Sequence, residues 1–188
     1  MKLTNKNNSF IRIILIIILS VLSVNTYSQV QEYAVKAALL EKFTLFIEWP
    51  KESGIDNKSQ PFIISVIGDN PFGKVLDNTY KNQKIKGKEV QINYISEIHE
   101  IEASHILFIS SSEKNELLNI ISYTKDKPIL TIGDTKGYYD KGVILNLFKR
   151  KNKINFILNK ESAKNSNLYI SYLLNNLSEV INKKGGEE

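Results

Sequence analysis

The segment PFIISVIG, residues 61–68, decides the fold class. It is a continuous apolar run of strand length, rich in β-branched residues, and Gly68 closes it. Continuous rather than alternating apolarity indicates a strand buried on both faces, which is the usual state of a strand in a parallel sheet. HILFIS (105–110) and KPILTIGD (127–134) have the same character. The sequence therefore predicts three buried strands of one α/β sheet.

Segments with helical spacing separate these strands. Between residues 33 and 48 the apolar side chains recur every three to four positions, which is typical of a helix with one buried face. Pro50 disfavours helical geometry at Trp49, so we expect this first helix to end there. The same spacing predicts helices over residues 72–81, 114–123 and 170–181, and the segment 111–113 is expected to cap the helix over 114–123, the third helix of the domain.

The remaining strand candidates are less buried. KEVQINYI (88–95) alternates apolar and polar residues, as expected for a strand with one wetter face. VILNLF (143–148) and KINFIL (153–158) flank the basic turn 149–153 and predict an antiparallel hairpin. The sequence thus predicts a single-domain α/β fold. Its central mixed, mostly parallel sheet is covered by helices on both faces, with an antiparallel hairpin near the C-terminus.

Residues 1–28 have the composition of a secretory signal peptide. Lys2, Lys6 and Arg12 precede an apolar run over 13–22, and the small residues Thr26 and Ser28 stand where a signal peptidase cuts. The run is much shorter than the ~20 residues that span a bilayer, which disfavours the alternative of a retained anchor. We expect cleavage before Gln29, a domain over 29–182 and a disordered tail over 183–188.

Net charge and cysteine content narrow the class of protein. The chain has 25 basic and 20 acidic residues; without the three basic residues of the leader, 22 basic residues remain, a net charge of +2. A nearly neutral domain disfavours nucleic acid as a partner, and the basic turn 149–153 is typical of a solvated hairpin end. Because the chain has no Cys, neither disulfides nor a lipid anchor on cysteine is available.

No catalytic or metal-binding signature occurs in the sequence. His99 and His105 are the only histidines, and HEIEASH (99–105) lacks a third ligand at a recognised spacing. There is no G-x-S-x-G elbow and no glycine-rich phosphate loop. We therefore predict no enzyme activity, no cofactor and no metal.

Two strand ends carry a weaker signal for a ligand. Gly68 and Asp69 follow one buried strand, and Asp134 follows another, which is where α/β folds place their sites. The alternative is turn chemistry, in which these polar groups bond the local backbone. Gly68, Asp69 and Asp134 are thus a weak ligand-binding prediction.

Several blocks of the sequence, in order, resemble the YfiR-like family. They are YAVKAALLEKFTLFIEWP (33–50), FIISVIGDNPFG (62–73), HILFIS, PILTIGDTKGY (128–138) and LYISYLLNNL (168–177). The resemblance implies an exported, periplasmic α/β protein that restrains an inner-membrane diguanylate cyclase through the periplasmic sensor domain of that enzyme, and thereby affects cyclic di-GMP and biofilm. A histidine kinase is the alternative membrane partner. Some members carry a Cys where this chain has Ser104, so the disulfide control that the resemblance implies for them cannot operate here.

This resemblance leads to a prediction of a partner-binding surface. Interfaces are enriched in aromatic residues, so we expect Phe43, Phe46, Trp49 and Pro50 to contact the partner. The alternative is that these rings pack the first helix on the sheet. The alternative function is a periplasmic small-ligand-binding accessory module of a sensing or transport system, and a homodimer is left open.

Overall fold

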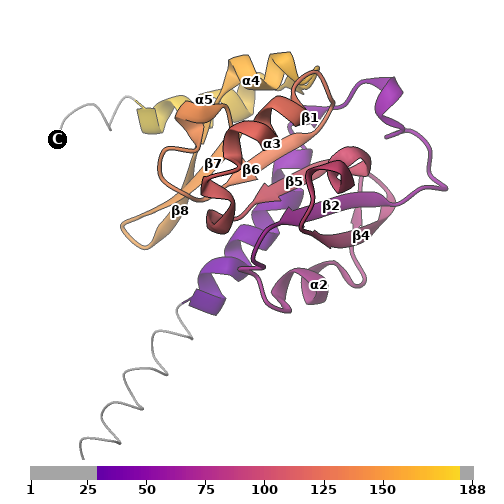
Figure 1. Ribbon diagram of the computed structural model, residues 1–188, viewed down its shortest axis with the longest axis horizontal. Coiled ribbons are helices and arrows are strands. Elements are labelled where there is room, and N and C mark those ends of the chain that lie inside the picture. Colours follow the sequence, from indigo (N-terminus) through magenta and orange to yellow (C-terminus); the bar gives the residue numbers. More distant parts are fainter. Residues whose placement is uncertain (1–28, 183–188) are drawn as a thin grey trace, which may run out of the picture.

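The computed structural model describes residues 29–182 and contains one seven-stranded sheet, in the order β3-β4-β2-β5-β6-β7-β8 (Figure 1). The five strands from β4 to β7 run parallel, and β3 and β8 are antiparallel to their neighbours. The strands are β2 (Phe62–Ile67), β3 (Lys84–Ile85), β4 (Lys88–Ile95), β5 (Ile106–Ile109), β6 (Leu130–Gly133), β7 (Leu145–Arg150) and β8 (Lys153–Leu158). The predicted α/β class, with a mixed, mostly parallel sheet and a C-terminal antiparallel hairpin, is confirmed. The predicted leader and tail lie outside the described residues.

A second, two-stranded sheet joins β1 (Ile47–Glu48) to β9 (Tyr169–Ile170). The helices are an N-terminal helix over residues 29–44, α2 (Val75–Tyr80), α3 (Leu117–Thr124), α4 (Lys160–Asn165) and α5 (Tyr172–Asn182). Four 3₁₀ turns connect elements: η1 (Lys51–Ser53), η2 (Ile98–Ala103), η3 (Ser111–Lys114) and η4 (Tyr139–Lys141).

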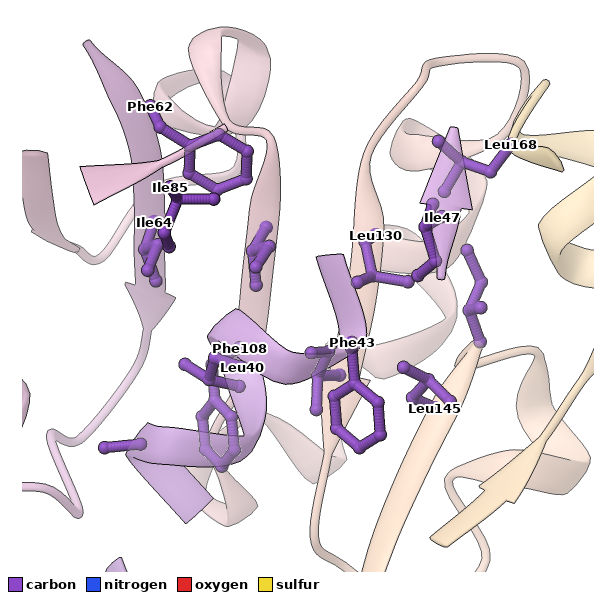
Figure 2. Close-up of a cluster of buried hydrophobic side chains, with 14 of the residues drawn as sticks. Leu40, Phe43, Ile47, Phe62, Ile64, Ile85, Phe108, Leu130, Leu145 and Leu168 are labelled. Carbon is purple, nitrogen blue, oxygen red and sulfur yellow. The ribbon is translucent and has the colours of Figure 1, made fainter. Parts of the chain in front are cut away.

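Helices cover both faces of the sheet because its central strands bury alternate residues in two cores. In β5, Ile106 and Phe108 belong to the larger core, whereas Leu107 belongs to the smaller one. The larger core contains the N-terminal helix, and Figure 2 shows Leu40 and Phe43 directed from that helix toward the sheet. The smaller core lies under α3 and η2.

The predicted end of the first helix is wrong, because the helix ends at residue 44 and the chain then forms β1. The Thr44 hydroxyl donates to the Glu41 carbonyl at 2.7 Å, and the next two amides bond carbonyls three residues back. Ile47 then pairs with Ile170 of β9. Local periodicity cannot reveal a pairing partner this distant in sequence, so the predicted helix extended beyond its true end.

The predicted cap of the third helix is also wrong. The segment 111–114 forms η3, and α3 begins at Leu117 without a side-chain cap. The Ser112 hydroxyl instead accepts the Asp69 amide at 2.9 Å. A long-range partner therefore outweighs the local capping pattern.

Candidate functional site: the ends of the sheet and an exposed apolar surface

Asp134, at the end of β6, is held by the N-terminal helix. Its carboxylate accepts from Lys36 Nζ at 2.6 Å and from the Tyr33 hydroxyl at 2.9 Å. Lys36, only 4% exposed, also pairs with Glu32 at 2.7 Å. Glu32 in turn lies 3.3 Å from Lys149 of β7. Each buried charge thus has an opposite charge beside it, which is the condition for burying ions at tolerable cost.

The titration behaviour of this cluster is that of a structural network. Burial raises the pKa of Tyr33, and the neighbouring Asp134 raises it further, so the phenol stays protonated and remains a donor. Burial alone would raise the pKa of Glu32, but Lys36 and Lys149 outweigh it and the pKa is lowered. The cluster therefore keeps the Tyr33 phenol protonated and the Glu32 carboxylate ionised, and it attaches the N-terminal helix to the end of β6.

The structure separates Gly68 and Asp69 from Asp134. Strand β5 lies between β2 and β6, so two strand spacings, about 10 Å, separate the two strand ends. Gly68 has φ +86°, and a Cβ there would lie 2.3 Å from the Ser112 hydroxyl oxygen, so η3 closes over this turn. Five cavities of about 270 to 660 Å³ in the described part of the chain are lined by other residues. The ligand-binding role of Gly68, Asp69 and Asp134 stays a prediction.

The aromatic residues predicted to meet a partner lie mostly in the core. Trp49 is 7% exposed and Phe43 is 3% exposed. The Trp49 ring packs edge-on against Phe62 with centroids 5.8 Å apart, and Phe43 packs likewise on Phe156 at 5.0 Å. These two residues follow the core-packing alternative.

Phe46 and Pro50, in contrast, are half-buried. Phe46 packs against the larger core, and its carbonyl accepts the amide of Ser171 at 2.8 Å. A role of Phe46 and Pro50 in partner binding stays a prediction. The apolar side chains of the region that are more than half exposed are different ones.

At the opposite end of the parallel strands, His105 is buried and neutral. Its Nδ1 accepts the Ile63 amide at 3.0 Å, which places the ring proton on Nε2. The ring stacks on Phe62 with centroids 4.7 Å apart. Burial lowers the pKa of His105 to about 4, with a contribution from Lys88. His105 is thus a satisfied core histidine on one nitrogen and an unpartnered donor on the other.

A cavity of about 550 Å³ lies beside this strand end and is lined in part by Ile63, Glu102, Ser104, His105 and Lys127. The other histidine, His99, is exposed on η2. Among residues 29–182, no group of three or more His, Cys, Asp or Glu side chains is placed to hold a metal ion.

An apolar surface lies around the β1–β9 sheet and α5. Five large side chains define it, and we name it the C-terminal apolar surface: Leu45 (65% exposed), Tyr169 (67%), Tyr172 (73%), Leu173 (63%) and Leu177 (55%). The Ser171 amide bonds the Phe46 carbonyl, which brings Leu45 and Tyr172 to the same end of the β1–β9 ladder. In α5, Leu174 and Ser178 face inward, so Leu173 and Leu177 face outward one turn apart.

A groove of about 550 Å³ adjoins this surface and shares Tyr169 and Tyr172 with it. Its lining includes Leu158, Lys164, Leu168, Tyr169, Ile170 and Tyr172, contributed by β8, α4, β9 and α5. Figure 1 shows α4 and α5 lying together along one side of the molecule, with α2 and β4 on the other. An exposed apolar patch with a polar rim is typical of a site that binds another protein or a ligand.

The sequence held a signal for this surface that periodicity alone missed. Tyr172, Leu173 and Leu174 are three consecutive large apolar residues at the start of a helix. Consecutive residues are separated by about 100° around a helix, so all three cannot face one core. The structure buries Leu174 and leaves the other two exposed.

Comparison with known proteins is informative at the level of the family. A family model described as YfiR/HmsC-like matches residues 33–179. The chain belongs to the YfiR/HmsC-like family. A comparison with curated proteins returns no match. Within the part of this YfiR/HmsC-like chain that the structure describes, no helix has the length and apolarity to cross a membrane.

Ser104 of this YfiR/HmsC-like domain takes part in a buried hydrogen bond between two serine side chains. Its hydroxyl lies 2.6 Å from that of Ser65, and both residues are buried. The pair joins β2 to the end of η2 by a hydrogen bond. This contact does not depend on redox conditions.

Proposed function

We propose that this YfiR/HmsC-like protein is an exported, periplasmic regulator without chemistry of its own. It binds the periplasmic sensor domain of a membrane-bound signalling protein, a diguanylate cyclase or a histidine kinase, and restrains it. Through a cyclase it lowers cyclic di-GMP and limits biofilm. Membership of the family supports this class of function, and the C-terminal apolar surface is the observation that carries it.

The C-terminal apolar surface has the composition of a binding site. Two tyrosines and three leucines stand more than half exposed around one two-stranded sheet and one helix. Leaving this much apolar area in water is unfavourable by roughly 25 cal/mol per Å², so a partner that covers it gains free energy. Tyrosine is enriched at the energetic centres of interfaces because its ring is apolar and its hydroxyl finds a partner at the rim.

The surface is also held in a defined conformation. The β1–β9 pairing and the Ser171–Phe46 hydrogen bond fix its start, and buried Leu174 fixes α5 on β8. Binding therefore orders few additional groups, which favours affinity. Lys164 on the groove wall adds positive charge and favours an acidic residue at the rim of the partner's surface.

The test of this proposal is a pair of variants in capture experiments. Tyr172→Ser with Leu173→Ser removes the centre of the C-terminal apolar surface, and we expect affinity for the co-produced sensor domain of the same organism to fall about 10- to 100-fold. If the partner is a cyclase, cells carrying this variant should contain more cyclic di-GMP. Capture and cyclic di-GMP are both measured against the unchanged protein.

Leu118→Ser is the matched control, because Leu118 is 62% exposed on α3 and does not line the groove beside the C-terminal apolar surface. It should leave capture unchanged, and circular dichroism should show that both variants are folded. Unaltered capture by the Tyr172→Ser, Leu173→Ser protein would refute binding through this surface.

A further inference from the structure

The cavity beside His105, which we name the His105 cavity, has a buried hydrogen-bond donor in its wall. His105 is 7% exposed and lines this cavity of about 550 Å³. Its Nδ1 accepts the Ile63 amide at 3.0 Å, so Nε2 carries the proton. Among residues 29–182, this N–H has no hydrogen-bond partner. Buried polar groups are nearly always paired, so an unpaired donor in a cavity wall favours a ligand that brings an acceptor.

A second unpaired donor lies on the same group of aromatic rings. Trp49 and His105 both pack against the ring of Phe62, at centroid distances of 5.8 and 4.7 Å. The indole Nε1–H of Trp49 is buried, and it too has no partner within the described part of the chain. Two buried N–H groups around one ring therefore lack acceptors.

A buried positive charge adds to this excess of donors. Lys88 is 1% exposed, and its Nζ donates to the Gly54 carbonyl at 2.9 Å. Over residues 29–182, no carboxylate forms an ion pair with it. Burial, and then the charge of Lys88, lower the pKa of His105, which places this ammonium near the ring. Because buried charges are ordinarily paired, the region favours an acceptor that is negatively charged.

The His105 cavity has the size and the walls of a site for a small organic molecule. Its volume of about 550 Å³ lies within the ordinary range of ligand sites. It opens at the starts of the neighbouring strands β2, β5 and β6, so its walls rest on the core of the sheet. The apolar part of the lining includes Pro61, Ile63, Pro128 and Ile129.

We infer that the His105 cavity binds a small monocarboxylate with an apolar body. The carboxylate accepts the Nε2–H of His105 in a charge-assisted hydrogen bond, and the ammonium of Lys88 favours its negative charge. The hydrocarbon part lies against the apolar lining. This site is at the opposite end of the parallel strands from Asp134, so it differs from the ligand site that the sequence predicted.

Two carboxylates in the lining restrict the ligand to a single negative charge. Glu52 and Glu102 are exposed and line the same cavity. They repel a second carboxylate on the ligand, whereas an apolar end meets no such repulsion. Lys127, which also lines the cavity, has its ammonium 3.2 Å from the centroid of the Tyr123 ring, where a cation–π interaction holds it. The site therefore discriminates against dicarboxylates.

Trp49 is the only tryptophan of the chain, so its fluorescence reports on the rings beside the cavity. The probes are butyrate, its uncharged amide butyramide, and succinate, which has the same carbon chain length and a second carboxylate. At pH 7 and constant ionic strength, we expect butyrate to give a saturable change with a millimolar Kd. Butyramide and succinate should bind at least about tenfold more weakly. No saturable change with butyrate, or equal binding of butyramide, overturns the inference.

A variant of His105 tests the proposed donor. His105→Asn keeps an acceptor for the Ile63 amide and removes the Nε2–H, so it should weaken butyrate binding at least about tenfold. His99→Asn is the matched control, because His99 is exposed and does not line the cavity. It should bind butyrate as the unchanged protein does. Unaltered affinity in the His105→Asn protein refutes the role of this N–H.

A second pair of variants tests the cavity without changing the core. Ala103 is exposed and lines the cavity, so Ala103→Phe fills it from the rim and should abolish butyrate binding. Ala38→Phe is the control, at an exposed position of the N-terminal helix outside the lining. Circular dichroism checks the fold of every variant. Retained butyrate binding by the Ala103→Phe protein places the ligand elsewhere and overturns the inference.

The rim carboxylates have their own test. Glu52→Gln with Glu102→Gln removes the repulsion, so the difference in affinity between butyrate and succinate should shrink, and an unchanged difference contradicts the role of the rim. The His105 cavity shares no lining residue with the groove beside the C-terminal apolar surface. Butyrate binding and partner capture are therefore measured at separate sites, and the failure of one is distinguishable from the failure of the other.

Discussion

His105 is a titratable side chain that the fold holds neutral, and it makes stability depend on pH. Its pKa is lowered to about 4, against an ordinary value near 6.5. Between pH 6.5 and pH 4, His105 is protonated in the unfolded chain but stays neutral in the folded chain. The free energy of unfolding should therefore be highest above pH 6.5 and fall by up to about 3 kcal/mol as the pH drops toward 4.

Urea denaturation at pH 7 and pH 4.5 measures this effect. His105→Asn keeps an acceptor near Nδ1 but removes the titration, so it should lose less stability than the unchanged protein over this range. His99→Asn, at an exposed histidine, is the control. Equal pH dependence in the His105→Asn and His99→Asn proteins would contradict the assignment to His105.

Lys36 neutralises Asp134 and Glu32 in a buried setting, so its removal should be costly. Lys36→Met leaves the Asp134 carboxylate, whose side chain is only 9% exposed, without its cation. We expect a loss of about 3 kcal/mol in the free energy of unfolding. Asp134→Asn in the same chain should recover part of this loss, because it removes the unpaired charge. Urea denaturation of both single variants and the double variant gives the coupling, and strictly additive losses would contradict a direct pair.

At the scale of elements, the β1–β9 sheet connects the end of the N-terminal helix to the start of α5 by backbone hydrogen bonds. Ser171→Pro removes the amide that bonds Phe46, and we expect a loss of about 1 kcal/mol and weaker protection of the α5 amides. Hydrogen exchange measures this directly, with the amides of β2 and β5 as the internal reference. Unchanged protection of α5 would show that Leu174 packing alone holds the helix.

The elements also differ in how far local sequence specifies them. The buried strands β2, β5 and β6 are predicted by their continuous apolar runs. The turn between β7 and β8 is predicted by its polar residues. Lys151 and Asn152 in this turn have the left-handed conformation that tight hairpins need. In contrast, β1 and β9 are two residues each and exist only because they meet. Helix α4 follows a local signal, the Asn159 cap that accepts the Ser162 amide, which periodicity did not detect.

At the scale of the whole molecule, the order of the strands places the C-terminal apolar surface and the outer edge of β4 on opposite sides of the sheet. β8 and α5 lie at one side of the sheet, next to the C-terminal apolar surface, and β4 lies near the other edge. The Asp134 cluster and the His105 cavity occupy the two ends of the parallel strands between them.

The sequence by itself determined the α/β class, the buried strands and the resemblance to the YfiR-like family, because these depend on apolar runs, turn residues and ordered motifs. It did not decide which apolar residues stay exposed. Trp49 and Phe43 became core, whereas Tyr172 and Leu173 remained in solvent. Exposure depends on which faces of distant elements meet, here β1 with β9 and α5 with β8. Only the tertiary structure brings those faces together, so only it shows which apolar side chains stay exposed.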